Sequence, residues 1–208
     1  MVGNRVQGTG YRGNTRAYSL RSRPALRPAL YPVPRTLYPV PRTLMTYTPI
    51  VATLGYVLSP NGEAVLMIHR NARPDDLHLG KYNGLGGKLE PGEDVVAGMR
   101  RELREEAQLE ALELTLRGTI SWPGFGKHGE HWLGFIFLIT RFSGEPPASN
   151  VEGSLEWVPV SRLLQLELPL WPGDRHFLPL VFSADPRQFH GVMPYQDGQP
   201  LSWRYSLI

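Results

Sequence analysis

The sequence predicts an α/β fold, an α/β/α sandwich in which helices cover both faces of a mixed β-sheet. Short apolar runs bounded by turn residues recur between residues 50 and 205 and indicate strands. One long amphipathic segment, 94–107, stands among these runs, and a second helical segment, 174–182, follows most of them. This order of strands and helices suits a layered α/β architecture with a mixed sheet.

The first two strands flank a tight turn. Residues 50–58 and 64–69 are apolar, and Ser-Pro-Asn-Gly at 59–62 is typical of the turn of a hairpin. The helix at 94–107 follows, with Val96, Met99, Leu103 and Ala107 spaced to form one apolar face. We expect the remaining strands at 112–121, 132–141, 155–158, 188–194 and 201–205.

Several of these later elements are predicted to pair or to be capped. Strands 112–121 and 132–141 form an antiparallel pair, and the last two strands form a terminal hairpin. The polar, proline-containing segment 142–153 is predicted to be a loop, and 160–165 a helical turn. Asp174 is expected to cap the second helix, because its side chain can accept hydrogen bonds from the first backbone N–H groups.

Three carboxylates share one face of the first helix. Residues three and four apart on a helix are neighbours, so Glu102 meets both Glu105 and Glu106. Without a cation these groups repel by a few tenths of a kcal/mol, roughly, for each exposed pair. Hard oxygen ligands suit Mg²⁺ or Mn²⁺, and Mg²⁺ typically combines one or two carboxylates with substrate phosphates. The spacing therefore predicts phosphate chemistry.

A charged helix face exposed to solvent is the simpler alternative. It accounts for the glutamates and arginines of the helix, but not for the glycines that precede it. Gly86-Gly87 and Pro91-Gly92-Glu93 suit a loop whose backbone approaches a ligand closely. Two faces, one apolar and one acidic, fit a helix that packs on a core and presents a metal site.

These residues resemble the Nudix box, G-x5-E-x7-R-E-U-x-E-E-x-G-U, in which U is a bulky aliphatic residue. Eight positions match: Gly87, Glu93, Arg101, Glu102, Leu103, Glu105, Glu106 and Leu109. The box glycine at the helix end is replaced by Gln108, which affects the helix exit and not the metal ligands.

The resemblance implies the Nudix fold and a hydrolase of a nucleoside diphosphate linked to another group. In such enzymes the acids that match Glu102, Glu105 and Glu106 bind Mg²⁺, or Mn²⁺ as an alternative, together with the carbonyl of Gly87. Glu102 or Glu105 would activate water, and Arg101 would orient the acids through ion pairs. General-base help of this kind is typically worth about 10² to 10⁴ in rate.

Glu152 is a further candidate. The family often places an additional acid near the metals a few residues before a strand, and Glu152 stands five residues before Trp157. The resemblance implies a metal-associated or water-activating role; a plain loop carboxylate is the alternative. His128 and His131 have a spacing that metal ligands can use, but a polar hairpin turn explains them better.

Segments outside the box resemble the MutT-type enzymes that hydrolyse oxidised purine nucleoside triphosphates, in particular the animal form. The resemblance covers residues 49–208 and is carried by 83–88, 171–174, 189–196 and 201–208. It implies that Asn83 hydrogen-bonds the base, Trp171 stacks on it and Asp174 reads its edge. Stacking is worth about 1–3 kcal/mol per base and tolerates any base, so Asn83 and Asp174 would discriminate.

Cations near the box are candidates for the phosphates. Lys88 adjoins the metal loop and is the preferred one; Arg70 and Lys81 are weaker candidates, since an exposed solvated cation is the usual explanation. Two positions depart from the animal pattern. Gly173 replaces the first of two adjacent acids, which affects the recognition of both oxidised adenine and oxidised guanine. Tyr82 replaces a tryptophan.

Composition limits the possible partners. The 208 residues contain no Cys, which excludes disulfides and thiolate sites, and no apolar run approaches a membrane span of about 20 residues. The net charge of +3 is unevenly placed: residues 1–44 carry eight Arg and no acid, which leaves 14 basic and 19 acidic residues in 45–208. We expect a nucleotide as ligand, a cytoplasmic monomer, and neither a nucleic-acid polymer nor a membrane as partner.

Residues 1–44 form a separate, Arg- and Pro-rich extension before the domain at 45–208. Leu-Tyr-Pro-Val-Pro-Arg-Thr occurs twice in tandem, at 30–36 and 37–43, and proline at this density opposes helices and sheets. A disordered tail, a transit peptide and translated upstream sequence are the three interpretations. We favour the third, with Met45 as the natural start, because the perfect repeat stops just before it.

The residues together predict hydrolysis of an oxidised purine nucleoside triphosphate such as 8-oxo-dGTP to monophosphate and pyrophosphate, a nucleotide-pool sanitation activity. Another Nudix substrate is the alternative: an ordinary triphosphate, ADP-ribose or a dinucleoside polyphosphate. A non-catalytic nucleotide-binding Nudix module is disfavoured, since such proteins usually lose acids of the box and this chain keeps them all.

Overall fold

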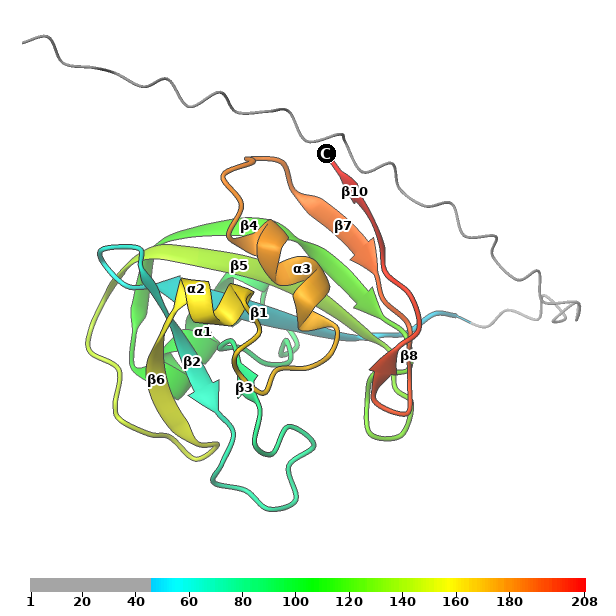
Figure 1. Cartoon of the computed structure of the whole chain (residues 1–208), viewed down its shortest axis with the longest axis horizontal. Coiled ribbons are helices and arrows are strands. Elements are labelled where there is room, and N and C mark those ends of the chain that lie inside the picture. Colours follow the sequence, from blue (N-terminus) through cyan, green and yellow to red (C-terminus); the bar gives the residue numbers. More distant parts are fainter. Residues whose placement is uncertain (1–45) are drawn as a thin grey trace, which may run out of the picture. The chain divides into compact units, whose positions relative to one another are not determined.

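The computed structural model describes residues 46–208, and the predicted extension at 1–44 lies outside them. An eight-stranded sheet runs through the described part in the order β10-β7-β4-β5-β1-β2-β3, and β6 pairs with β2 (Figure 1). The sheet is mixed: β1 runs parallel to β5 and β4 parallel to β7, whereas the other pairs are antiparallel. The strands are β1 Ile50–Leu58, β2 Ala64–His69, β3 Tyr82–Asn83, β4 Glu110–Trp122, β5 Trp132–Ser143, β6 Ser154–Pro159, β7 Phe189–Val192 and β10 Arg204–Leu207.

Helices cover both faces of this sheet, as predicted. Alternate residues of β2 belong to two separate cores: Leu66 and Ile68 pack with α1 (Val95–Ala107), whereas Val65 and Met67 pack with α2 (Val160–Leu164) and α3 (Asp174–Val181). Side chains of a strand point alternately to opposite faces, so α1 lies on one face and α2 and α3 on the other. The α/β/α sandwich is therefore confirmed.

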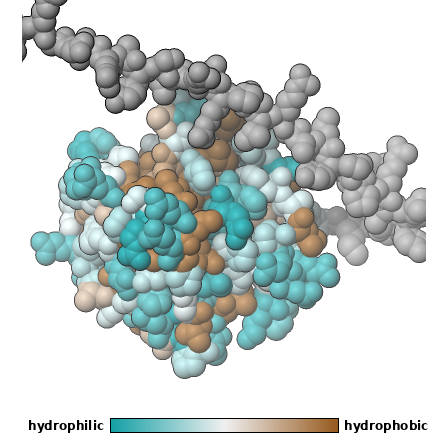
Figure 2. Space-filling view, in the orientation of Figure 1, coloured by the Kyte–Doolittle hydropathy of each residue, from teal (hydrophilic) through white to brown (hydrophobic). Residues whose placement is uncertain are grey.

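The outer sides of α2 and α3 face solvent. Figure 2 shows hydrophilic and apolar residues interspersed over this face of the domain. Leu164, at the end of α2, is 38% exposed, whereas Leu163 beside it is fully buried. This is the pattern of helices that form an outer layer of a sandwich. None of the helices within 46–208 is long and apolar enough to cross a membrane.

Helix α1 has a side-chain cap at its start and a left-handed residue, which is not glycine, at its end. Asp94 is its N-cap and accepts hydrogen bonds from the N–H groups of Val96 and Ala97 at 2.8 and 2.9 Å. The helix exits through Gln108 in the left-handed conformation (φ 57°, ψ 29°), the geometry that the box glycine normally provides. The replacement thus keeps the exit path and places a side chain in a conformation that glycine prefers.

Several details differ from the predictions. Strand β3 was not predicted, and β4 (110–122) and β7 (189–192) differ from the predicted 112–121 and 188–194. Asp174 does not cap α3: it is the first residue of the helix, and its carboxylate accepts from the backbone N–H of Trp171 at 3.1 Å. Strand β5 continues to Ser143, two residues into the predicted loop. The second strand of the terminal hairpin is 204–207 instead of 201–205, because a small hairpin of β8 (Tyr195–Gln196) and β9 (Gln199–Pro200) intervenes.

Candidate functional site

A glycine-rich loop brings the box to the edge of β1. The N–H of Thr53 donates to the carbonyl of Gly87 at 2.8 Å, and Gly55 and Leu85 exchange hydrogen bonds at 2.6 and 2.9 Å. A Cβ on Gly86, whose φ is +141°, would collide with the carbonyl of Thr53. The glycines therefore allow the loop backbone to pack closely against β1; the predicted close approach to a ligand stays a prediction. The carbonyl oxygen of Gly87, the predicted metal ligand, accepts the one hydrogen bond from Thr53 and keeps a second lone pair.

The same loop touches two of the three helix carboxylates. The Glu102 carboxylate packs directly on Gly87, where any Cβ would collide with it. The Glu106 carboxylate accepts the N–H of Gly86 at 2.7 Å. Glu102 and Glu106 are thus held between α1 and the loop, whereas Glu105 is 58% exposed at its side chain.

Arg101 ties the box together. Its guanidinium donates to both carboxylate oxygens of Glu93, at 3.1 and 2.8 Å, which is the bidentate geometry that arginine favours. Nη1 also donates to Glu102 at 2.9 Å and to Glu105 at 3.1 Å, and Nη2 donates to the carbonyl of Lys88 at 3.0 Å. The hydrogen bonds from Arg101 to Glu93 lower the pKa of Glu93. Arg101 therefore contacts three acids of the box, and the orienting role that the resemblance implies stays a prediction.

Glu152 lies beside the helix acids. It is in the loop before β6, where Asn150 Oδ1 accepts its N–H at 2.8 Å and Asn150 Nδ2 donates to the carbonyl of Glu106 at 3.0 Å. Its carboxylate pairs with Arg70, which also pairs with Asp76 at 2.6 Å. Arg70 is thus a partly buried cation already paired with two carboxylates rather than a free phosphate ligand, and Glu152 is attached to the site.

The carboxylates are close enough to perturb one another. Burial, helped by the charges of Glu105 and Glu152, raises the pKa of Glu102 in spite of Arg101. Burial and the charge of Glu152 raise the pKa of Glu106 well above its usual range. Within residues 46–208 no three acidic or imidazole side chains already surround one point as ligands. The donor set nevertheless fits a hard divalent cation, because it gathers carboxylate oxygens and because burial and mutual repulsion raise the pKa of Glu102 and Glu106.

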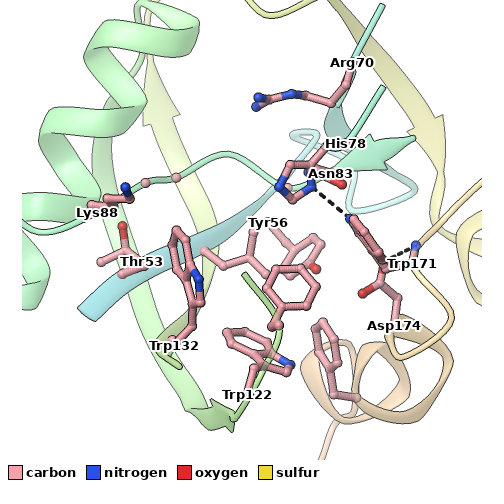
Figure 3. Close-up of a pocket in the computed structure, with 18 of the residues that line it drawn as sticks. Thr53, Tyr56, Arg70, His78, Asn83, Lys88, Trp122, Trp132, Trp171 and Asp174 are labelled. Atoms are coloured by element: carbon pink, nitrogen blue, oxygen red, sulfur yellow. Dashed lines mark hydrogen bonds between the residues drawn. The ribbon is translucent and has the colours of Figure 1, made fainter. Parts of the chain in front are cut away.

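A pocket of about 340 Å³, lined by Glu152 among these acids, extends into the fold (Figure 3). Six residues predicted as ligands or substrate contacts line it together with the weaker candidate Arg70, although the six come from three separate segments: Asn83, Gly87, Lys88, Glu152, Trp171 and Asp174. Its wall is aromatic, formed by Trp122, Phe125, Trp132, Phe177 and Tyr195. An apolar, aromatic cavity with a few polar groups suits a nucleobase.

Several polar atoms in the pocket remain unpaired. Thr53 Oγ1, Asn83 Oδ1 and Trp132 Nε1 are buried and have no hydrogen-bond partner among the described residues. Buried polar atoms normally have partners, so these three are places where a bound ligand would supply one. Lys88 Nζ lies 5.5 Å from the centre of the Trp132 ring, at the end of the pocket that also holds Thr53 and lies away from Asn83 (Figure 3).

Asp174 is the one carboxyl at the aromatic end. Burial raises its pKa to about 7, against the hydrogen bond from Trp171 and the charge of Lys81. The carboxyl can therefore be protonated near neutral pH and donate a hydrogen bond. Lys81 itself lies over the Trp171 ring, 4.9 Å from the ring centre, and donates to the carbonyl of Leu170, so it does not face the phosphate end.

The space left by Gly173 is filled. A Cβ at residue 173 would collide with the Tyr195 hydroxyl and with Met193 Sδ. Burial raises the pKa of Tyr195, and the charge of Asp174 adds to this, so the phenol stays neutral. The pocket thus presents one carboxyl and one neutral hydroxyl where the animal pattern has two acids.

Sequence reasoning missed His78, Phe125 and Tyr195. His78 comes from the segment 70–81 between β2 and β3, and Phe125 from the turn between β4 and β5 that was predicted around His128 and His131. That turn is confirmed: His131 Nδ1 accepts the N–H of Gly124 and His128 N–H donates to Glu130. His78 and Phe125 lie outside regular structure, where no periodicity could have indicated them, and Tyr195 lies in the two-residue strand β8, which is too short to show one.

Comparisons with known proteins agree with this geometry. Residues 48–181 match the family model described as NUDIX domain. The chain is 32% identical over 114 residues to the uncharacterized Nudix hydrolase YvcI of Bacillus subtilis, which covers 53% of this chain and 69% of that protein. It is 33% identical over 128 residues to the oxidized purine nucleoside triphosphate hydrolase of Mus musculus, covering 62% and 78%. A solved MutT structure from Bacillus halodurans superposes with a TM-score of 0.64 at 28% identity, over 76% of this chain and 97% of that one.

Proposed function

Because the chain belongs to the NUDIX family, we propose that it hydrolyses an oxidised purine nucleoside triphosphate, such as 8-oxo-dGTP, to the monophosphate and pyrophosphate. Nudix hydrolases act on nucleotides and generally use divalent metals. The finer assignment, nucleotide-pool sanitation with Mg²⁺, goes beyond the family.

The continuous pocket is the observation that supports this proposal. Its aromatic end contains Asn83, Trp171 and Asp174, and its other end contains Gly87, Lys88 and Glu152 beside the box acids. A purine base between Trp171 and the facing aromatic wall would leave its phosphates near Lys88 and α1. The animal relative that is 33% identical is named for the hydrolysis of oxidised purine nucleoside triphosphates.

The proposed hydrolysis assigns roles to only a few residues. Water would attack a phosphorus of the phosphate chain, forming one P–O bond while the bridging P–O bond breaks and pyrophosphate leaves. Glu105, exposed and held by Arg101, or Glu102 would take the proton of that water. A bound Mg²⁺ would neutralise charge that develops on the phosphate oxygens. Lys88 would bind the phosphates from the other side.

One feature favours a second candidate, a broader nucleotide substrate. Aromatic stacking on Trp171 tolerates any base, and the aromatic end of the pocket has one lining carboxyl, Asp174, to discriminate between them. Gly173 leaves the base edge with fewer charged contacts than the animal pattern has. An ordinary triphosphate, ADP-ribose or a dinucleoside polyphosphate is therefore the alternative.

Hydrolysis by the full chain in the presence of Mg²⁺ tests both candidates. The panel is 8-oxo-dGTP, 2-hydroxy-dATP, dGTP, ADP-ribose and a dinucleoside polyphosphate, with pyrophosphate and orthophosphate measured separately. We expect kcat/KM for 8-oxo-dGTP to exceed that for dGTP by about tenfold or more, with pyrophosphate released, since a site that pairs a polar edge rejects analogues lacking it. Equal rates would indicate a general triphosphatase, and activity on ADP-ribose alone would refute the proposal.

Two matched variants separate catalysis from binding. Glu105→Gln should lower kcat by about 10² to 10⁴ if Glu105 is the base. Glu110→Gln is the control, because Glu110 is also an exposed glutamate paired with an arginine, at 3.2 Å from Arg104, but lies outside the site. Equal activity of both variants would exclude Glu105 as the base and leave Glu102 as the candidate.

A further inference from the structure

The segment 70–81 places a histidine against the two residues proposed to bind the base. The indole Nε1 of Trp171 donates to His78 Nδ1 at 2.8 Å, and the amide Nδ2 of Asn83 lies 2.8 Å from the same nitrogen (Figure 3). The His78 ring also meets the Trp171 ring edge-on, with centroids 5.4 Å apart. One ring nitrogen thus contacts both side chains, which are 88 residues apart in the sequence.

The hydrogen-bond donors that surround His78 determine which of its ring nitrogens carries the proton. An indole N–H can only donate, so Nδ1 must be an acceptor and the ring proton must be on Nε2. Asn83 therefore has to present its NH₂ end to His78, because its carbonyl oxygen would face another acceptor. The environment agrees, since burial and the charges of Arg70 and Lys81 hold the pKa of His78 at about 4 and keep it neutral.

The position of His78 is itself fixed by neighbours on both sides. Its backbone N–H donates to Asp76 at 3.0 Å, and its carbonyl accepts the N–H of Lys81 at 2.9 Å. Asp76 is in turn paired with Arg70, at 2.6 Å. The imidazole is therefore a fixed acceptor and not a mobile loop side chain.

We propose that His78 is a positioning residue for nucleotide recognition: it fixes the stacking ring of Trp171 and turns Asn83 so that its carbonyl oxygen is the atom offered to the base. The unpaired state of Asn83 Oδ1, buried in the pocket without a partner among residues 46–208, is what this orientation leaves. The ligand class that fits is a nucleotide whose base offers an N–H to that oxygen. The inference rests on the proposed function, because it assigns the base to this end of the pocket.

Two substitutions separate the acceptor from the ring. His78→Phe keeps a planar ring and removes the acceptor, leaving the Trp171 and Asn83 donors unpaired. His78→Asn removes the ring but keeps an oxygen near the position of Nδ1. His190→Phe is the matched control, since His190 is a partly buried histidine whose Nδ1 lies 2.9 Å from Thr119 Oγ1, away from this pocket.

Binding of 8-oxo-dGMP to the full chain without metal is the measurement, followed by tryptophan fluorescence and checked by calorimetry. We expect His78→Phe to raise Kd about tenfold or more, because a buried donor left unpaired is costly, and His78→Asn to stay within about threefold of the native value. His190→Phe should bind as the native chain does. In hydrolysis the His78→Phe loss should appear more in KM than in kcat.

Either of two results overturns the inference: His78→Phe binding as tightly as the native chain, or His78→Asn binding as weakly as His78→Phe, which would make the ring shape decisive. NMR of the unmodified protein gives a test that needs no variant. The neutral Nε2–H tautomer of His78 is expected, and an Nδ1–H tautomer would refute the arrangement.

The proposed function and this inference can fail separately. If 8-oxo-dGTP is hydrolysed equally well by His78→Phe, the function stands and the inference falls. If the panel identifies another nucleotide as the substrate, and its binding depends on the acceptor at residue 78 in the way described, the inference stands and the oxidised-purine assignment falls.

Discussion

Asp174→Asn tests the physical origin of the proposed base recognition. Burial raises the pKa of Asp174 to about 7, whereas an aspartate in the unfolded chain has a pKa of about 3.9. Between these values the folded state binds one proton that the unfolded state does not, so stability falls as pH rises from about 4 to about 7. A difference of about three pKa units corresponds to about 4 kcal/mol, and partial exposure of the residue reduces this to about 2–4 kcal/mol.

The neutral amide of the variant keeps the acceptor for the Trp171 N–H and cannot ionise. The stability of Asp174→Asn relative to the native chain should therefore increase with pH, from a small difference at about pH 4.5 to about 2–4 kcal/mol at about pH 8.5. The neighbouring Tyr56 and Tyr195 do not interfere, because the pKa of each is raised from its already alkaline ordinary value.

Urea unfolding followed by circular dichroism, at half-unit steps between about pH 4.5 and 8.5, gives this difference directly. Asp75→Asn, at an exposed aspartate of the segment 70–81, is the control and should show no such trend. The same carboxyl should change from a donor to an acceptor over this range, so the preference for 8-oxo-dGTP over dGTP should depend on pH in the native chain and be flat in the variant. A stability difference independent of pH would refute the assignment of the raised pKa to Asp174.

Two stability changes follow from backbone geometry and packing. Gln108→Gly should stabilise the fold by about 0.5–1 kcal/mol in urea unfolding, because residue 108 is left-handed (φ 57°) and glycine adopts that conformation without strain; a loss of stability would show that the Gln108 side chain makes a contribution of its own. Gly173→Ala should destabilise by about 1–3 kcal/mol, since its Cβ would collide with the Tyr195 hydroxyl and Met193 Sδ. Tyr195→Phe should recover part of that loss, and additive effects of the two substitutions would exclude the collision with the hydroxyl.

The fold was predictable where side-chain periodicity is strong. The apolar runs on either side of a turn gave β1 and β2 their observed limits, and the apolar face of 94–107 indicated α1, in which Asp94 is the N-cap and not the first helical residue. The terminal hairpin was placed three residues early in its second strand. Asp197 and Gly198 both have positive φ values, 51° and 72°, and form the β8–β9 turn, an Asp-Gly signal that went unused.

The site was predictable from spacing only near the box. Glu102, Glu105 and Glu106 follow from helix geometry, and the contact of Arg101 with Glu93 spans only eight residues. Asn83, Trp171 and Asp174 required a resemblance, because no local pattern indicates that residues so far apart line one cavity. His78 was indicated neither by residue spacing nor by the resemblance. The segment that carries it has no regular structure, and its proposed role depends on the two side chains that it contacts.

Gly173 shows why a departure from a family pattern needs the structure for its interpretation. Read from the sequence, it is a missing acid and suggests an empty position at the base edge. The structure fills that position with Tyr195, whose hydroxyl a side chain at 173 would strike. Two adjacent carboxyls would repel one another and raise one pKa through that repulsion. Here burial alone raises the pKa of Asp174, while Lys81 lowers it, so the protonation of a single carboxyl controls the charge at the base edge.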